Sequence, residues 1–244
     1  MDARALRVVV LTGAGVSADS GVATFRGAGG LWEGQRIEDV ATPQAWRRDP
    51  ELVWRFYQLR RAALARVEPN AGHRALVELE RQLAAVGASF TLVTQNVDDL
   101  HERAGSRELL HMHGELAVLR CERCDARVRD LERVDPTAFA SCAGCGHERL
   151  RPDVVWFGEM PYHMDAIEPA LARCTHFLAV GTSGVVYPAA GFLALAREQG
   201  ARTCVQALER PENAHGADVF VPGRCAEALP ELLEGLAREW GLPR

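Results

Sequence analysis

Lysine is absent from this chain. All 28 basic residues among its 244 are arginine, so the protein has no side-chain amine that could be acylated. We attribute the bias to the arginine- and alanine-favouring codons of a GC-rich genome. A net basic charge is absent as well, because 33 acidic residues leave a formal charge of −5. No overall positive field therefore draws the chain to nucleic acid or to an anionic membrane surface.

Long hydrophobic runs are also missing. Stretches such as VVVL at 8–11 and FLAVG at 177–181 are far shorter than the roughly 20 apolar residues that span a bilayer. The start, MDARALRVVVLTGAG, lacks the charged, apolar and small-residue segments of a secretory signal. Apolar residues make up 48% of the chain and charged residues 25%, as in an ordinary globular protein with its own core. We therefore expect no membrane partner.

The seven cysteines are an odd number, which does not favour a framework of disulfides. Cys121-x-x-Cys124 is followed, after 17 residues, by Cys142-x-x-Cys145, a spacing typical of four-thiolate zinc ribbons. Four thiolates close a tetrahedral site without water, so we expect a structural zinc ion that replaces the core this polar stretch cannot build. Free thiols fit a reducing compartment, and we expect the chain to be cytoplasmic.

Short apolar runs alternate with helical patterns along most of the chain. Helices are predicted at 72–85 and 225–242, where leucines recur at helical spacing. This alternation predicts an α/β fold with a parallel sheet covered on both faces, whose ligands lie at the carboxyl ends of the strands. Two segments interrupt the rhythm, a helical module at about 27–68 and the cysteine-bearing stretch at about 116–152. Strands are predicted within residues 7–15, 89–96, 175–183, 201–208 and 217–223.

His113 stands just before Gly114, where the chain is expected to leave the sheet for the cysteine-bearing stretch. Because four cysteines complete a metal site, neither His111 nor His113 is needed as a ligand. An imidazole at such a cleft-like position suits acid–base chemistry, but a lone histidine there is more often structural. The residues alone leave both interpretations open.

A glycine-rich loop, LTGAGVSADSG at 11–21, follows the first predicted strand. Gly13 and Gly15 would let backbone amides approach a phosphate. The third glycine of the strict dinucleotide pattern is replaced by Ala18, and no acidic ribose-binding residue follows at the expected distance. The loop therefore indicates a nucleotide site, but not a hydride-transferring dehydrogenase.

A series of motifs occurs here in the order found in sirtuins, the NAD-dependent protein-lysine deacylases. They are GAGVSADSGVATFRG at 13–27, PNAGHRAL at 69–76, TQNVDDLHERAG at 94–105, HGE at 113–115, the paired CxxC motifs, RPDVVWFGE at 151–159 and GTSGVVYPAAG at 181–191. The resemblance covers almost the whole chain. FRGAGGLW at 25–32, DVATP at 39–43 and FYQLR at 56–60 resemble the subgroup of bacterial deacylases and the desuccinylase/demalonylase branch.

The resemblance implies one catalytic domain over residues 1–244. Its larger part would be a Rossmann-like, doubly wound parallel sheet built from about 1–26, 69–115 and 153–244. Its smaller lobe would combine the helical insertion, about 27–68, with the zinc module, about 116–152. NAD and the acylated lysine would meet in the cleft between them. The residues implied to bind NAD are Gly13, Ala14, Gly15, Ser17, Ala18, Gly21, Thr24, Phe25, Arg26, Trp32, Gln95, Asn96, Asp98, Gly181, Thr182, Ser183, Ala207, Leu208, Glu209 and Cys225.

The activity implied is removal of acetyl, succinyl and malonyl groups from protein lysines, with His113 as general base and with nicotinamide and 2′-O-acyl-ADP-ribose as products. Tyr57 and Arg60, spaced i, i+3 on one helical face, would reach the far end of an acyl pocket that the small Ala41 leaves roomy. Acylated peptides would bind by strand addition, and a monomer is favoured. The residues implied to contact substrate are Ala41, Tyr57, Arg60, Val154, Val155, Trp156, Phe157, Gly158 and Val186.

Two other functions remain in competition. A mono-ADP-ribosyltransferase would use the same NAD site. A non-catalytic interaction module would bind NAD or depend on zinc without catalysing a reaction. The presence of His113 and of QNVD at 95–98 argues against the module. One departure from the family pattern concerns the cofactor: Ala207 stands where relatives carry an asparagine that holds the adenosine ribose, so we expect weaker NAD binding.

Overall fold

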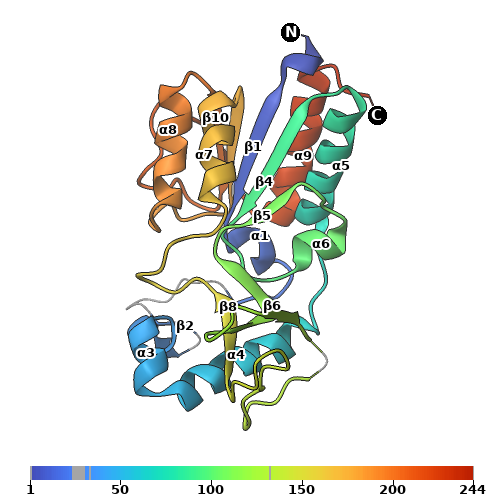
Figure 1. The fold of residues 1–244 in the computed structure, drawn as a ribbon. Coiled ribbons are helices and arrows are strands. Elements are labelled where there is room, and N and C mark those ends of the chain that lie inside the picture. The colour runs from blue at the N-terminus through green and yellow to red at the C-terminus, as the bar shows by residue number, and fades with distance from the viewer. Residues whose placement is uncertain (1, 24–30, 33, 132, 244) are drawn as a thin grey trace.

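The structure is a computed structural model that describes residues 2–23, 31–32, 34–131 and 133–243, with only the backbone described at 31–32. Figure 1 shows two parts, a large lobe that carries both termini at its far end and a smaller lobe built around α4 and the strands β6 and β8. The elements of the large lobe are η1 (Ala3–Ala5), β1 (Arg7–Thr12), α1 (Gly15–Ala18), α5 (Ala71–Ala85), β4 (Ser89–Thr94), α6 (Leu100–Ala104), β5 (Leu109–His111), α7 (Met164–Arg173), β9 (His176–Val180), η2 (Ala189–Gly191), α8 (Phe192–Glu198), β10 (Arg202–Ala207), β11 (Val219–Pro222) and α9 (Cys225–Glu239).

The large lobe is a parallel sheet in the order β11-β10-β9-β1-β4-β5. Successive residues of β1 point to opposite faces, as a strand requires. Val8 and Val10 face a core shared with α5 and α9, whereas Val9 and Leu11 face a core shared with α7 and α8. Figure 1 shows these helix pairs on either side of the sheet. The α/β doubly wound prediction is confirmed, and each predicted strand is present.

The strand order changes direction at β1, which is flanked by β4 on one side and β9 on the other. The loops after these three strands open apart there, so the carboxyl ends leave room for a ligand. The glycine loop follows β1, Gln95 follows β4 and Gly181 follows β9. The topology therefore brings three motifs together that lie up to about 170 residues apart in sequence.

The smaller lobe pairs a three-stranded antiparallel sheet with a group of helices. Its core joins α4 residues such as Trp54 and Tyr57 to Leu119, Leu150 and Trp156 of the strand region. The strands of the cysteine-bearing stretch bury their apolar side chains against these helices, so the core of the stretch is one that it shares with the helical segment. Its elements are β2 (Leu31–Trp32), β3 (Gln35–Arg36), α2 (Ile37–Val40), α3 (Pro43–Arg48), α4 (Pro50–Leu64), β6 (Gly114–Cys121), β7 (Arg127–Arg129) and β8 (Leu150–Val154).

Two helices near the cleft have clear local start signals. The Asp49 side chain accepts the Leu52 amide at 3.0 Å, and Pro50 occupies the first turn of α4. At α5, Asn70 accepts the Gly72 amide at 2.8 Å while the His73 ring accepts the Asn70 amide at 3.3 Å, which forms a capping box. These caps fix where α4 begins and hence which of its residues face the cleft.

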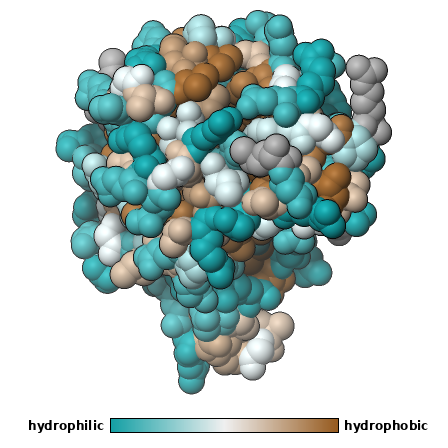
Figure 2. Space-filling model, turned by 90° about the horizontal axis from the view of Figure 1, so that it is seen from above, coloured by the Kyte–Doolittle hydropathy of each residue, from teal (hydrophilic) through white to brown (hydrophobic). Residues whose placement is uncertain are grey.

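Surface features are unremarkable at the end that carries the termini, where hydrophilic residues predominate with hydrophobic ones interspersed (Figure 2). Among the helices that the structure describes, none has the length and apolar character needed to cross a membrane.

Candidate active site

The four predicted metal ligands lie together. The sulfur atoms of Cys121 and Cys145 are 3.6 Å apart, as are those of Cys124 and Cys142, and all four sulfurs lie within 4.8 Å of one another. A disulfide needs about 2.05 Å, whereas sulfurs at 2.3 Å from a central zinc ion stand about 3.8 Å apart. The arrangement therefore fits a tetrahedral zinc ion, and it is closed by cysteine alone.

Neither histidine of the HMH segment belongs to this cluster. The Nε2 atom of His111 lies 2.7 Å from Glu102, and its Nδ1 atom lies 3.2 Å from the Asn96 carbonyl oxygen. Since both partners accept, His111 donates from both nitrogens, and the ion pair with Glu102 raises its pKa against the opposing effect of burial. His113 lies elsewhere, at the cleft.

A cavity of about 410 Å³ opens between the two lobes. Its walls combine the loops at the carboxyl ends of β1, β4 and β9 with the small-lobe segments at 41–60 and 154–161. Most of the predicted site residues line it, namely Gly13, Ala14, Gly15, Ala41, Tyr57, Arg60, Gln95, Asn96, Asp98, His113, Val154, Val155, Trp156, Phe157, Gly158, Gly181, Thr182, Ser183 and Val186. The structure thus gathers them around one space, while their individual roles stay predictions.

The other predicted residues that the structure describes lie outside that lining. Ser17 is buried behind it and accepts the Asn96 side-chain amide at 3.1 Å. Gly21 lines a smaller neighbouring cavity that also touches Arg60. Ala207 and Cys225 are buried, whereas Leu208 is 58% exposed. Glu209 is exposed and Ala18 is half-buried. Thr24, Phe25, Arg26 and the side chain of Trp32 fall outside the described residues.

Some lining residues were not predicted. A sequence signal was present for three of them. Val97 lies between the predicted residues Asn96 and Asp98, and Val185 and Tyr187 flank Val186 in the motif at 181–191. Glu159 closes the quoted motif at 151–159, whereas Pro161 has no local signal, because its place depends on how the chain turns after β8. The full set is Val22, Ala23, Val97, Glu159, Pro161, Val185 and Tyr187.

Gly114 holds His113 at the junction of the two lobes. Its φ is +78°, and a side chain there would collide with the Asp153 carbonyl oxygen, so only glycine lets β6 pass this close to β8. On the other side, the Val155 amide donates to the His113 carbonyl at 2.8 Å. The backbone at His113 and Gly114 is thereby held against the small lobe at Asp153 and Val155.

Among the residues that the structure describes, the imidazole of His113 has one hydrogen-bond partner. Its Nδ1 atom lies 3.1 Å from the Gln95 carbonyl oxygen, which can only accept, so Nδ1 carries the proton and Nε2 has the lone pair. Burial lowers the pKa of His113 below its ordinary value, and the Gln95 bond opposes this. The ring is therefore neutral at pH 7 and available as a base.

The neighbouring amides are fixed at the carboxyl ends of β4 and β9. The Gln95 side chain donates to the Thr182 hydroxyl at 3.0 Å, and the Asn96 backbone amide donates to the Thr94 hydroxyl at 3.0 Å. Burial raises the pKa of the Asp98 carboxyl, although hydrogen bonds from Ser17 and the Leu100 amide oppose the rise. The polar floor of the cavity is thus held in place before any ligand arrives.

The glycines of the first loop serve a packing role that the sequence pattern does not reveal. A Cβ on Gly13 would stand 2.9 Å from Thr182 atoms, and one on Gly15 would stand 2.7 Å from Gly181. The Gly15 amide also donates to the Gly181 carbonyl at 2.8 Å. Both glycines are required for the loops after β1 and β9 to touch, whatever binds beside them.

The small-lobe end of the cavity carries Tyr57, Arg60, Ala41 and Trp156. The Trp156 Nε1–H donates to the Tyr57 hydroxyl at 2.9 Å, and both rings are almost fully buried. Burial raises the pKa of Tyr57 well above its ordinary value, against the opposing effect of that bond, so the phenol stays protonated. Arg60 lies one helical turn from Tyr57 with 7% of its surface exposed.

Comparison with known proteins agrees with this geometry. The Sir2 family model matches residues 13–188. A protein of Caulobacter vibrioides named NAD-dependent protein deacylase is 52% identical over 95% of this chain and 97% of its own. A solved Sir2 homologue–NAD complex has a TM-score of 0.87 at 37% identity, covering 98% of this chain and 93% of its own. Sir2Af2 bound to a myristoylated histone peptide has a TM-score of 0.72 at 30% identity, covering 96% and 92%. With a family match over most of its length and relatives at about half identity, this chain belongs to the Sir2 family, the sirtuins.

Proposed function

We propose that this chain is an NAD-dependent protein-lysine deacylase. The observation that carries the proposal is the cavity between the lobes, where the neutral, oriented His113 faces the same space as the glycine loop and the acyl-sized end at Tyr57. Its relative in Caulobacter vibrioides carries the name of this activity. The Sir2 homologue solved with NAD and the one solved with an acylated histone peptide support the same two ligands here.

The walls of the large lobe would hold NAD. Gly13, Ala14 and Gly15 supply backbone at the pyrophosphate, and Thr182 and Ser183 supply hydroxyls beside it. Gln95 and Asn96 would line the nicotinamide and ribose end. When bound, NAD supplies an electrophilic ribose carbon whose bond to nicotinamide can break. The four cysteines would hold zinc outside the cavity, where it stabilises the lobe and takes no part in the chemistry.

His113 would act as the general base. Its Nε2 lone pair accepts the proton of a ribose hydroxyl, while the Gln95 carbonyl holds the opposite nitrogen and so keeps the tautomer. The apolar walls at Val154, Trp156 and Phe157 exclude water from the acyl group. Holding the acyl oxygen against the ribose carbon supplies much of the rate, because an amide oxygen is a weak nucleophile.

The rim of the cavity supports peptide binding by strand addition. Phe157, Val185 and Tyr187 line the cavity and are 45%, 62% and 78% exposed, an unusual exposure for large apolar side chains. Neither rim segment is a strand in the free chain, so pairing would order both around an extended peptide. A monomer suffices for this arrangement, and the cysteine-held zinc fits a reducing compartment such as the cytoplasm.

Release of nicotinamide tests the function against the transferase alternative. The chain is incubated with NAD and either an acetyl-, succinyl- or malonyl-lysine peptide or the same peptide unmodified. A deacylase releases nicotinamide only with the acylated peptides, because the acyl oxygen is its nucleophile. Release with the unmodified peptide, together with an ADP-ribosylated peptide, would establish the transferase instead.

Replacement of Arg60 by methionine tests the acyl preference. Arg60→Met keeps the length of the side chain but removes the guanidinium that could pair with a terminal carboxylate. We expect kcat/KM for succinyl- and malonyl-lysine peptides to fall roughly tenfold or more, and to fall less for acetyl-lysine. Arg55→Met, on the exposed side of the same helix, is the control. Equal losses on all three acyl groups would exclude this role.

A further inference from the structure

Trp156 is held rigidly in the wall of the acyl pocket. It is 2% exposed, its ring centroid lies 5.8 Å from that of Trp46 and 6.3 Å from that of Tyr57, and the Arg151 guanidinium lies 3.5 Å above it. A cation over an indole face is attracted by the negative face of the ring. The indole is thus fixed by two tilted aromatic neighbours and by a charge over its face.

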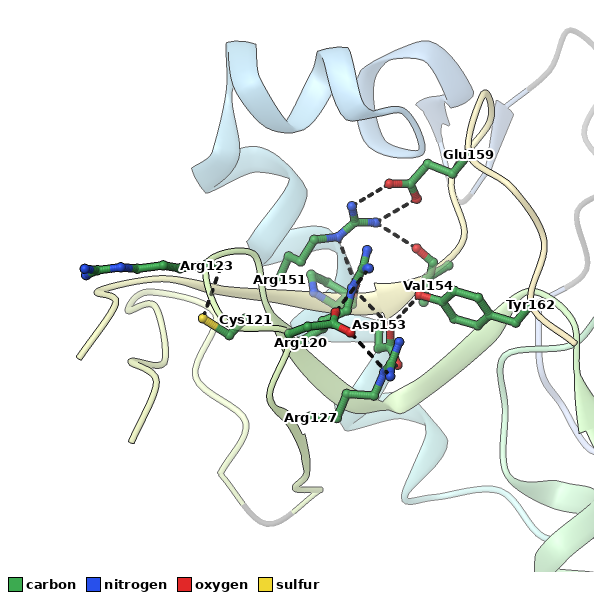
Figure 3. A network of polar contacts seen from close by, with 11 residues as sticks. Arg120, Cys121, Arg123, Arg127, Arg151, Asp153, Val154, Glu159 and Tyr162 are labelled. Carbon is green, nitrogen blue, oxygen red and sulfur yellow. Dashed lines mark hydrogen bonds and ion pairs between the residues drawn. The ribbon is translucent and has the colours of Figure 1, made fainter. Parts of the chain in front are cut away.

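The charge above the ring is itself clamped. Arg151 pairs with both Glu159 oxygens, at 2.6 and 2.9 Å, and donates to the Val154 carbonyl at 2.8 Å (Figure 3). Glu159 also accepts the Trp156 backbone amide at 2.8 Å. One bidentate ion pair therefore closes the turn after β8 and fixes both the backbone and the ring of Trp156.

The orientation of Trp156 determines what the Tyr57 hydroxyl can do. An indole N–H can only donate, so the 2.9 Å bond from Trp156 Nε1 takes up an acceptor site on the Tyr57 oxygen. The phenolic proton must then point away from Trp156. A hydroxyl that accepts one hydrogen bond also becomes a stronger donor for the next, because hydrogen bonds in a chain polarise one another.

We infer that Trp156 is a specificity-determining positioning residue, which makes the Tyr57 hydroxyl a hydrogen-bond donor for acyl groups that end in a carboxylate. The inference rests on the proposed deacylase function and deepens it. A carboxylate accepts but cannot donate, so a hydroxyl held as a donor favours succinyl and malonyl groups. An acetyl group ends in a methyl and gains nothing from the donor. Selectivity would then depend on two hydrogen bonds in series, from Trp156 to Tyr57 and from Tyr57 to the ligand.

A double-mutant cycle tests this chain of bonds. Trp156→Phe removes the indole N–H, Tyr57→Phe removes the hydroxyl, and the third variant carries both. For each protein kcat/KM is measured with succinyl- and acetyl-lysine forms of one peptide, at saturating NAD. Trp54→Phe is the matched control, since Trp54 is buried in the same core and its indole N–H donates to the Asp135 carbonyl at 2.8 Å, outside the cavity.

We expect Trp156→Phe to lower the succinyl-to-acetyl ratio of kcat/KM about fivefold, in line with one lost hydrogen bond. In the Tyr57→Phe background the same change should leave the ratio where Tyr57→Phe alone put it, and Trp54→Phe should keep the wild-type ratio. If Trp156→Phe does not fold, Trp156 is replaced by benzothienylalanine, whose sulfur takes the place of the N–H. An unchanged ratio, or equal and additive effects in both backgrounds, would overturn the inference. A wild-type chain inactive on every acylated peptide would instead overturn the deacylase proposal.

Discussion

Replacement of His113 by alanine is expected to lower kcat for deacylation about 10²- to 10⁴-fold, the usual contribution of a positioned base. In the proposed reaction, Nε2 of His113 is the atom that removes the ribose proton. Binding of NAD and peptide should change little, so KM should move far less than kcat. His215→Asn, an exposed histidine in the loop after β10, should retain wild-type rates. A His113→Ala variant that keeps more than half of the wild-type kcat would contradict the assignment.

The pH profile gives an independent check on the same residue. Burial lowers the pKa of His113, so the neutral form that accepts protons persists below the ordinary value of about 6.5. The kcat/KM for an acetyl-lysine peptide should therefore stay level from neutral pH down past 6.5 and fall only in more acidic solution. An acidic limb centred above pH 7 would show that the His113 ring is not in the environment described.

Loss of zinc is expected to have the second large effect, this time on stability. Cys121 and Cys142 are buried within the core that also contains Trp46, Tyr57 and Trp156. Cys142→Ser should release the metal, loosen this core and cost more than about 3 kcal/mol, since structural zinc in small domains is worth roughly 10–16 kcal/mol. A cost of that size lowers the midpoint of thermal unfolding by about 6–12 °C in a chain of this length.

The measurements are zinc content by elemental analysis, thermal unfolding by circular dichroism and tryptophan fluorescence. Activity should fall with the metal, because Trp156 and Tyr57 line the cavity. Cys204→Ser, which changes a partly buried cysteine in the large lobe, should retain one zinc ion per chain and its activity. A Cys142→Ser variant that unfolds at the wild-type temperature would show that the cluster does not hold the lobe together.

Local patterns predicted the large lobe well, because parallel strands buried on both faces are continuous apolar runs such as Val8–Leu11. The zinc ligands were predicted equally well, since each CxxC motif forms its turn locally and the two turns together supply all four ligands. The β2–β3 hairpin had no such signal, as its strands are two residues each. The apolar core shared by α4 and β6 was underestimated, because its partners lie on separate segments that look polar by themselves.

At the site, too, some features could be predicted from the sequence and others could not. Motif resemblance named most residues around the cavity, but not what holds them. The bond from Trp156 to Tyr57 joins residues 99 positions apart, and the Arg151–Glu159 pair depends on a turn whose path no spacing predicts. The glycines at 13 and 15 were interpreted as phosphate contacts, whereas their tight approach to Gly181 is visible only once β1 and β9 are neighbours. Tertiary pairings of this kind are decided by topology rather than by local sequence.

The absence of lysine makes one measurement unusually clean. Apart from its N-terminus, the chain has no amine that could take up or lose an acyl group, so every acyl transfer in the mixture belongs to the peptide. The enzyme is mixed in excess with NAD and a limiting amount of succinyl-lysine peptide, and all products of the single turnover are quantified by mass spectrometry. The proposed deacylation yields equal amounts of free-lysine peptide, nicotinamide and succinyl-ADP-ribose. Free succinate formed while NAD stays intact would contradict it.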